Sequence, residues 1–144
     1  MKKLFVMLLL VQASVIFSQE VVIKSLKTFT TKDANSIPVL SSPRDLLTID
    51  FDVQAEYPPN IHIIFKFCDR NWNATDNIFL ANQGQNTAYT FNYFSLPTTV
   101  EDAKYHYTNT FPDKDGYVSF PFFGKWKYYI VDSQDYNIVF GEGR

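Results

Sequence analysis

The sequence predicts an all-β protein, an antiparallel β-sandwich, and three observations lead to this fold class. Residues 47–56 (LTIDFDVQAE) alternate strictly between apolar and polar side chains, which is the pattern of a strand with one face in water. Similar segments recur along the chain, separated by clusters of Pro, Asn, Asp and Gly that break strands. The 14 Phe, 9 Tyr and 2 Trp supply large rings for a core. This matters because the single cysteine cannot form an internal disulfide.

The strands can be placed in order from their patterns. In residues 61–68, the side chains at alternate positions from Ile61 to Phe67 form an inward apolar face. A Pro-Pro-Asn run at 58–60 imposes the turn before this strand. The set is typical of an immunoglobulin-like sandwich of about seven to nine strands. Strands are predicted at residues 20–29, 47–56, 61–68, 87–96, 118–123, 126–131 and 137–140, with a further one beginning at Tyr105.

One segment favours a helix. Residues 98–103 follow Pro97, and Thr98 precedes Glu101 by three positions, as in a capping box. The aromatic β-former Tyr105 follows at once. We therefore expect one short helical turn here before the next strand.

The N-terminus has the layout of a secretory signal peptide. Lys2 and Lys3 precede an uncharged apolar stretch, and Ser18 supplies a small residue before the expected cleavage. The stretch is shorter than the ~20 residues of a membrane-spanning helix, so no transmembrane segment is expected in the mature chain. Residues 1–18 are predicted to be a signal peptide. Residues 19–144 are predicted to be a single β-sandwich domain, or the N-terminal domain of a longer protein, because the sequence ends in a turn-like Gly-Glu-Gly-Arg.

Charge and compartment limit the ligands that can be expected. Without the leader, the chain has 11 basic and 15 acidic residues, a net charge of −4. Nucleic acid binding needs clustered Lys and Arg, and anionic membranes attract polybasic segments, so neither is expected. The signal peptide places the protein in the periplasm, in association with the outer membrane, or outside the cell.

The segment Asp69-Arg70-Asn71-Trp72 is the candidate partner-binding site. Trp72 could stack on a partner's side chain or a sugar, with Asp69 and Arg70 giving directional hydrogen bonds. The alternative is structural. Asp and Asn suit the turn that leaves a strand, and Trp72 would then fold back over the open end of the sandwich.

No catalytic, cofactor or metal site is expected. Cys68 lies about 20 Å from His62 along the predicted strand, so the pair is not a nucleophile and base. Zinc needs three or four closely spaced ligands, which two histidines and one thiol do not offer. Asp113 and its neighbours are expected to form a hairpin turn, and Asp132 and Asp135 a turn between strands. The protein is therefore expected not to be an enzyme.

An ordered set of motifs resembles a known family. The motifs are residues 45–52 (DLLTIDFD), 67–72 (FCDRNW), 86–89 (NTAY) and 124–130 (GKWKYYI). Together they resemble the first, immunoglobulin-like domain of the type IX secretion system plug proteins. The resemblance implies an envelope location and a role in occluding or escorting an outer-membrane channel, and it implies no catalytic residues.

Two functions follow as expectations. The first is a non-catalytic protein–protein interaction module, an accessory, plug-like component of an outer-membrane type IX secretion complex, whose partner is a protein such as the channel itself. The alternative is a carbohydrate-binding module, which needs exposed, coplanar aromatic rings. Tyr89, Phe91 and Tyr93 alternate along one predicted strand, and burial in the core explains them equally well.

Overall fold

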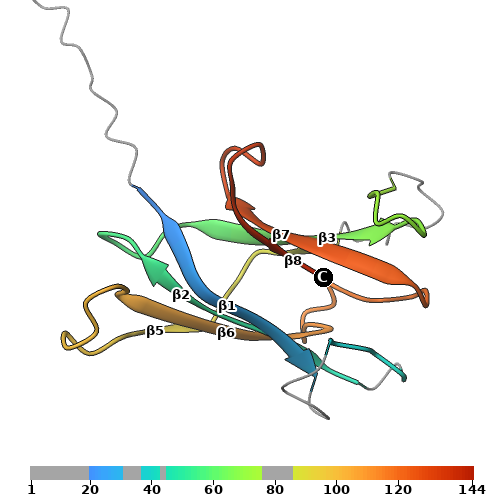
Figure 1. Cartoon of the computed structure of the whole chain (residues 1–144), viewed down its shortest axis with the longest axis horizontal. Coiled ribbons are helices and arrows are strands. Elements are labelled where there is room, and N and C mark those ends of the chain that lie inside the picture. Colours follow the sequence, from blue (N-terminus) through green and yellow to red (C-terminus); the bar gives the residue numbers. More distant parts are fainter. Residues whose placement is uncertain (1–19, 31–36, 43–44, 76–85) are drawn as a thin grey trace, which may run out of the picture.

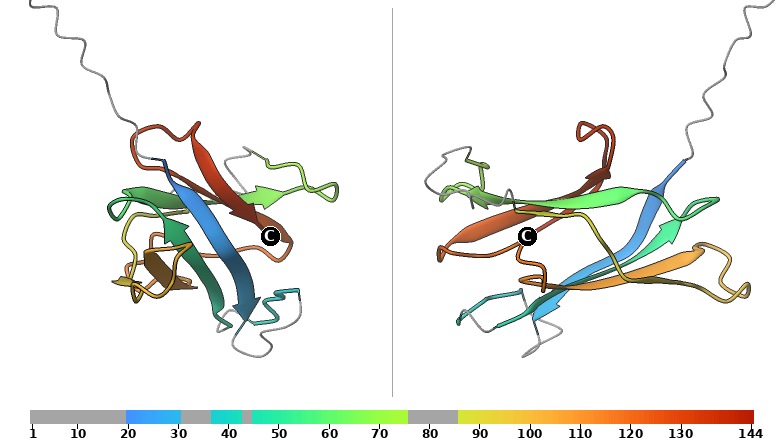
Figure 2. Two further views of the ribbon diagram at one scale, coloured as in Figure 1. Left: turned by 60° about the vertical axis from the view of Figure 1, so that its left-hand side comes forward. Right: turned by 180° about the vertical axis from the view of Figure 1, so that it is seen from behind.

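The protein is a β-sandwich of two four-stranded antiparallel sheets, which confirms the predicted fold class (Figures 1 and 2). A computed structural model describes residues 20–30, 37–42, 45–75 and 86–144. The predicted signal peptide, residues 1–18, lies outside the described residues. Sheet A has the order β1 (Val22–Thr30), β2 (Leu47–Gln54), β6 (Tyr105–Phe111), β5 (Tyr93–Ser95), and sheet B has the order β4 (Thr87–Ala88), β3 (Ile61–Cys68), β7 (Lys125–Asp132), β8 (Val139–Gly143).

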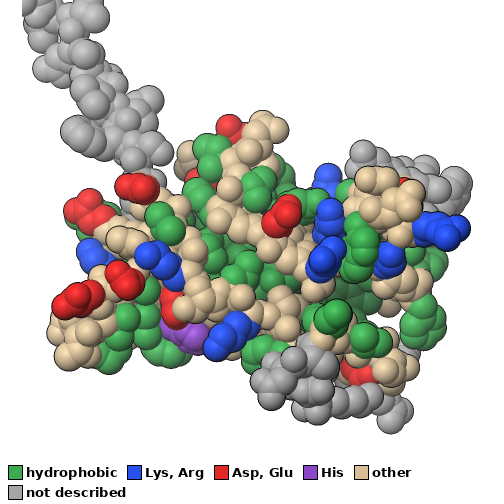
Figure 3. Space-filling view, viewed as in Figure 1, with side chains coloured by type: hydrophobic (Ala, Val, Ile, Leu, Met, Phe, Trp, Pro, Cys, Tyr) green, Lys and Arg blue, Asp and Glu red, His purple; other side chains and the backbone are tan. Residues whose placement is uncertain are grey.

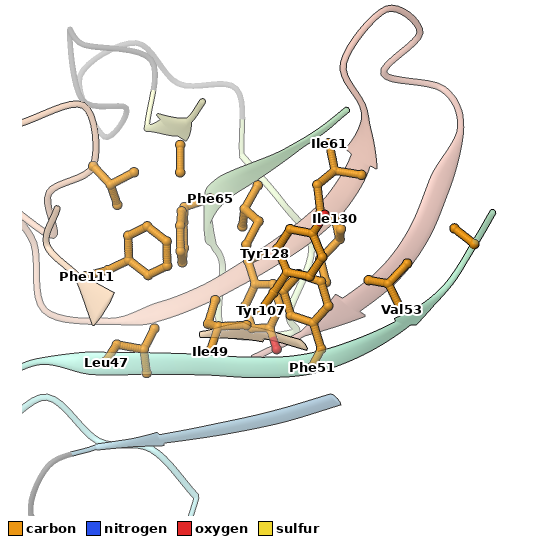
Figure 4. Packing of buried hydrophobic residues seen from close by; sticks show 14 residues of the cluster. Leu47, Ile49, Phe51, Val53, Ile61, Phe65, Tyr107, Phe111, Tyr128 and Ile130 are labelled. Atoms are coloured by element: carbon orange, nitrogen blue, oxygen red, sulfur yellow. The ribbon is translucent and has the colours of Figure 1, made fainter. Parts of the chain in front are cut away.

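The core fills the space between the two sheets (Figure 4). Alternation along β2 directs Phe51 inward, where its ring stacks on Tyr107 of β6 at 5.1 Å between centroids. From sheet B, Phe65 packs against Phe111 of sheet A at 4.8 Å. Burial of these rings drives the two layers together. The buried cluster consists of Leu47, Ile49, Phe51, Val53, Ala55, Ile61, Ile63, Phe65, Ala88, Tyr107, Phe111, Val118, Tyr128 and Ile130.

A hydrogen bond joins β1 of sheet A to β7 of sheet B. Tyr128 of β7 is buried, and its Oη lies 2.5 Å from Thr28 Oγ1 of β1. Gly143 of β8 pairs with Tyr128, and a Cβ at Gly143 would overlap the Tyr128 phenol. The absence of a side chain at 143 therefore lets β8 pass close to the ring.

The predicted strand at 87–96 is in fact two strands in different sheets. Ala88 of β4 pairs with Ile63 in sheet B, whereas Tyr93 of β5 pairs with Tyr107 in sheet A. The chain between them crosses from one layer to the other (Figure 2). The sequence prediction missed the crossing because Phe91, inside it, still packs against the core and so preserves the alternation.

The predicted strand at 118–123 is wrong, because this segment is irregular. Val118 is fully buried, which gave the segment the look of a strand. The Ser119 N–H donates to Asn86 Oδ1 at 3.1 Å instead of to a neighbouring strand. Pro121 has no N–H to donate to a ladder.

The predicted helical turn is also replaced, and the described part of the chain contains no helix. Val100 N–H donates to the Pro97 carbonyl at 2.9 Å, and Leu96 N–H donates to Lys104 at 2.8 Å. These bonds close the β5–β6 loop. Residues 97–102 are exposed, and a short helix needs a buried apolar face to be stable. No described helix is long and apolar enough to cross a membrane.

Candidate functional site

The candidate site lies where β3 ends and β7 begins. Cys68 of β3 pairs with Lys125 of β7. The loop that leaves β3 (residues 69–74) and the loop that enters β7 (residues 121–124) therefore emerge at the same end of sheet B (Figure 1). We call these two loops the β3/β7 end surface. The first of them contains the predicted site.

Asp69 folds the first loop back on itself. Its Oδ1 accepts hydrogen bonds from the backbone N–H groups of Asn71 (2.8 Å) and Asn73 (2.9 Å), and its Oδ2 accepts one from the Asn73 amide (3.1 Å). The bonds from Asn73 are the main reason that the pKa of the Asp69 carboxyl lies below its usual value. Asp69 is thus a turn former, in line with the structural interpretation of its sequence position.

Trp72 is half-buried on the outside of sheet B and does not belong to the core cluster. Lys125 Nζ lies 4.8 Å from the centre of its indole ring, and Arg144 Cζ lies 5.0 Å from it. Both distances are within the range of cation–π attraction. The backbone of Trp72 has φ +67°, which is uncommon for a bulky residue. Strained backbone of this kind is frequent at functional sites.

Arg70 and Asn71 form the exposed tip of the same loop. The backbone carbonyl of Arg70 accepts a hydrogen bond from Lys125 Nζ at 2.6 Å, so a side chain of β7 fixes the loop from below. The Arg70 guanidinium makes no ion pair with a carboxylate in the described residues. Of the four predicted residues, Asp69 is engaged within the loop, Trp72 is flanked by cations, and Arg70 and Asn71 face water.

The second loop adds an exposed aromatic side chain. Phe123 is 81% exposed. Its neighbour Phe122 is held in place, because its ring meets Phe67 at 6.3 Å and its carbonyl accepts a bond from the Trp126 indole at 3.2 Å. Gly124, at φ +156°, passes so close to Phe67 that a Cβ would come within 2.6 Å of that ring. The loop is therefore fixed while Phe123 points into solvent.

Phe123 and Lys125 were not among the site residues predicted from the sequence. A Pro-Phe-Phe-Gly run before a strand was the available signal, because Pro and Gly mark a turn and an exposed apolar patch marks an interaction site. Lys125 and Trp72 are far apart in the chain, so their contact cannot be predicted from the spacing of residues in the sequence.

Cys68 and His62 are held by different partners. The thiol is 3% exposed and bonds to the Lys66 carbonyl at 3.6 Å. Burial raises the pKa of Cys68, although Lys127 and Lys125 act in the opposite direction. His62 Nδ1 is 2.9 Å from Tyr136 Oη, and burial lowers the pKa of this imidazole. The two side chains do not form a nucleophile–base pair.

The acids predicted to form turns do so, but the turn at Asp113 is not the predicted hairpin, because residues 118–123 after it are not a strand. Asp113 accepts hydrogen bonds from the N–H groups of Tyr117 (3.2 Å) and Val118 (2.5 Å). Asp132 Oδ1 accepts bonds from residues 134 and 135, and Asp135 caps Asn137. Among the described residues, no group of three or more His, Cys, Asp or Glu could hold a metal ion.

A polar cluster on the outer face of sheet A is structural. His106 of β6 bonds through Nε2 to Asp50 (2.8 Å) and through Nδ1 to Asp52 (2.7 Å), both on β2. Phe94 of β5 lies against the same imidazole at 4.9 Å. Because its two ring nitrogens both contact carboxylates of β2, His106 links strands β6 and β2.

The three aromatic residues considered for sugar binding do not share one face. Tyr89 contacts His62 of sheet B at 4.9 Å, and Tyr93 stacks on Tyr107 of sheet A at 5.2 Å. Phe91, between them, packs against the core. Four other rings form a contiguous set. The ring of His62 lies 5.6 Å from that of Tyr136 and 4.9 Å from that of Tyr89, and the rings of Tyr89 and Tyr117 are 5.4 Å apart.

Comparison with known proteins supports the fold. No protein-family model matches the chain, and no curated protein matches it. The fold is similar to the crystal structure of a hypothetical protein from Parabacteroides merdae, with a TM-score of 0.65 and 18% sequence identity over 87% of this chain. The match covers 32% of that protein, so this chain spans about a third of its length. At this identity the similarity shows the sandwich fold alone.

Proposed function

We propose that the protein is a non-catalytic, exported interaction module that binds another protein through its β3/β7 end surface. The observation that carries the proposal is the exposed ring of Phe123 on a fixed loop, at the same end of sheet B as the cation-flanked Trp72. Interface energy concentrates on Trp, Tyr and Arg, with aromatic anchors near the centre. Arg70 and Trp72 supply two of these residue types within one loop.

The rigidity of the surface supports a role in binding. The Asp69 carboxylate closes one loop, and Phe122 and Gly124 fix the other. A surface that is ordered before its partner arrives loses less conformational entropy on binding. Phe123 is therefore presented at little entropic cost.

The cellular setting of the proposal comes from the sequence. The signal-peptide pattern supports export, and the motif resemblance to type IX secretion plug proteins supports an accessory role at an outer-membrane channel. An immunoglobulin-like sandwich is also what that resemblance implies. On this proposal the partner is the channel or a protein bound to it.

The proposal is tested by site-specific photo-crosslinking in the native cell envelope. A photoreactive residue replaces Phe123 or Asn71 in the full chain, and Lys104, exposed at the β5–β6 loop of sheet A, is the control position. We expect adducts with the same protein from 123 and 71, and none from 104. No adduct from 123 or 71, or adducts of equal yield from all three positions, would contradict the proposal.

One observation favours carbohydrate binding as a second function. Tyr89, Tyr117 and Tyr136 are each more than a third exposed. The rings of Tyr89 and Tyr136 contact His62, and the ring of Tyr117 contacts Tyr89. The contacts are near perpendicular, at 76° to 83°, so the cluster offers a corner and not a flat platform. A glycan-array screen of wild type and Tyr117→Ala tests this function, which requires binding that the substitution removes.

A further inference from the structure

Cations gather on sheet B next to the β3/β7 end surface. Trp126 and Tyr128 of β7 face the core. Because side chains alternate along a strand, Lys125 and Lys127 point to the outer face of sheet B. Arg144 follows Gly143, which pairs with Tyr128, and its guanidinium lies against Trp72. In Figure 3, Lys and Arg side chains collect over the ends of β3, β7 and β8. We call Arg70, Lys125, Lys127 and Arg144 the cation cluster.

The cluster is unexpected for this chain. The full sequence has a net charge of −2, so a local excess of cations does not follow from composition. Lys127 stands directly opposite Lys66 in the β3–β7 register, so these two cations are neighbours on the sheet. Within the described residues, no carboxylate pairs with any member of the cluster. Asp69, the acid next to Arg70, uses its oxygens within its own loop.

We infer that the β3/β7 end surface and the cation cluster together bind an acidic polypeptide segment that carries an apolar anchor residue. Carboxylates on the segment would pair with Arg70, Lys127 and Arg144 in charge-assisted hydrogen bonds. Phe123, exposed on the loop that leads into Lys125, would take the anchor side chain. The inference rests on the proposed function and adds the chemistry of the partner.

A polypeptide fits these features better than a membrane or a polyanion does. The chain as a whole is acidic, so an extended anionic surface would repel it outside the cluster. A free phosphate or sulfate chain has no apolar group for Phe123. A short acidic segment meets the cations and the ring and touches little else.

The probe is a fluorescein-labelled peptide of repeating Glu-Glu-Phe, and the matched control is its Gln-Gln-Phe isostere. We expect the acidic peptide to bind the full chain, and the neutral peptide to bind at least about tenfold more weakly. Affinity for the acidic peptide should fall as salt rises from about 0.05 M to about 0.5 M, because exposed charges are screened. Equal binding of the two peptides would overturn the inference.

Variants locate the site. The double substitution Lys127→Glu with Arg144→Glu should weaken binding of the acidic peptide by at least about tenfold. Lys104→Glu changes one charge on sheet A and should leave affinity within about twofold. An equal loss in the control would overturn the inference, as would tighter binding of heparin or of phosphatidylglycerol vesicles than of the acidic peptide. Melting curves of all variants establish that they are folded.

The two proposals can fail separately. If the photo-crosslinked adduct at 123 forms equally well with Lys127→Glu and Arg144→Glu, the interaction module stands and the acidic partner is refuted. If the acidic peptide binds as expected but no adduct forms at 123 or 71 in the envelope, the cation cluster binds acidic segments but the proposed function is refuted.

Discussion

The substitution Trp72→Ala tests whether the Trp72 side chain belongs to an interaction surface or to the core. The indole ring is half-buried outside the core cluster, with one cation at 4.8 Å and another at 5.0 Å. An exposed cation–π contact contributes about 0.5–1 kcal/mol, so removing both should lower the free energy of unfolding by about 1–2 kcal/mol. Phe65 is 4% exposed and meets three other rings, and Phe65→Ala should cost about 3–5 kcal/mol.

Urea denaturation of the two variants measures the difference directly, and the crosslinking yield at 123 measures binding. We expect Trp72→Ala to lose most of the adduct with a small change in stability. Trp72→Gly is a matched control for the backbone, because glycine adopts φ +67° without strain. It should be at least as stable as Trp72→Ala. A loss of stability from Trp72→Ala as large as that from Phe65→Ala would refute the placement of Trp72 outside the core.

Three further predictions concern the fold. Gly143→Ala puts a Cβ into the Tyr128 phenol and should cost about 1–3 kcal/mol of unfolding free energy, measured in urea. A double-mutant cycle of Thr28→Val and Tyr128→Phe should give a coupling of about 0.5–1.5 kcal/mol for the bond between the sheets, and a value near zero would contradict that bond. Burial is the main cause that raises the pKa of Tyr107 to about 12, and the electrostatic effects of the nearby Tyr93 and Tyr105 add to it. Above pH 10 the unfolded chain loses this proton first, so stability should fall as pH rises from about 10 to about 12, by at most about 1.4 kcal/mol per unit, and Tyr107→Phe should flatten that fall.

The sandwich could be predicted because one face of each long strand is exposed to solvent, so polar and apolar residues alternate along it. In β2 the alternation from Leu47 to Gln54 matches the observed burial of every odd position, and the turns formed by Asp113 and Asp132 follow from local hydrogen bonding. The segment containing Phe91 could not be assigned correctly, because a buried ring looks the same in a strand and in a chain that crosses between layers. Single-residue patterns carry no information on which sheet a short strand joins.

The candidate site was predicted in part. The loop after Cys68 could be found because its polar residues interrupt an apolar strand. Its neighbours could not, because Lys125 and Arg144 reach Trp72 only through the pairing of β3, β7 and β8. The register of a sheet is a tertiary property, and it decides which charges become neighbours.

The most direct test of the proposed binding surface is to map the bound acidic peptide by nuclear magnetic resonance. The Glu-Glu-Phe peptide is titrated into the isotope-labelled protein and the amide and indole shifts are followed. We expect the Trp72 indole N–H and the amides of Phe123 and Lys125 to shift together and saturate, while β1, β2 and β6 of sheet A are unaffected. Shifts centred on sheet A, or on the tyrosines around His62, would contradict it.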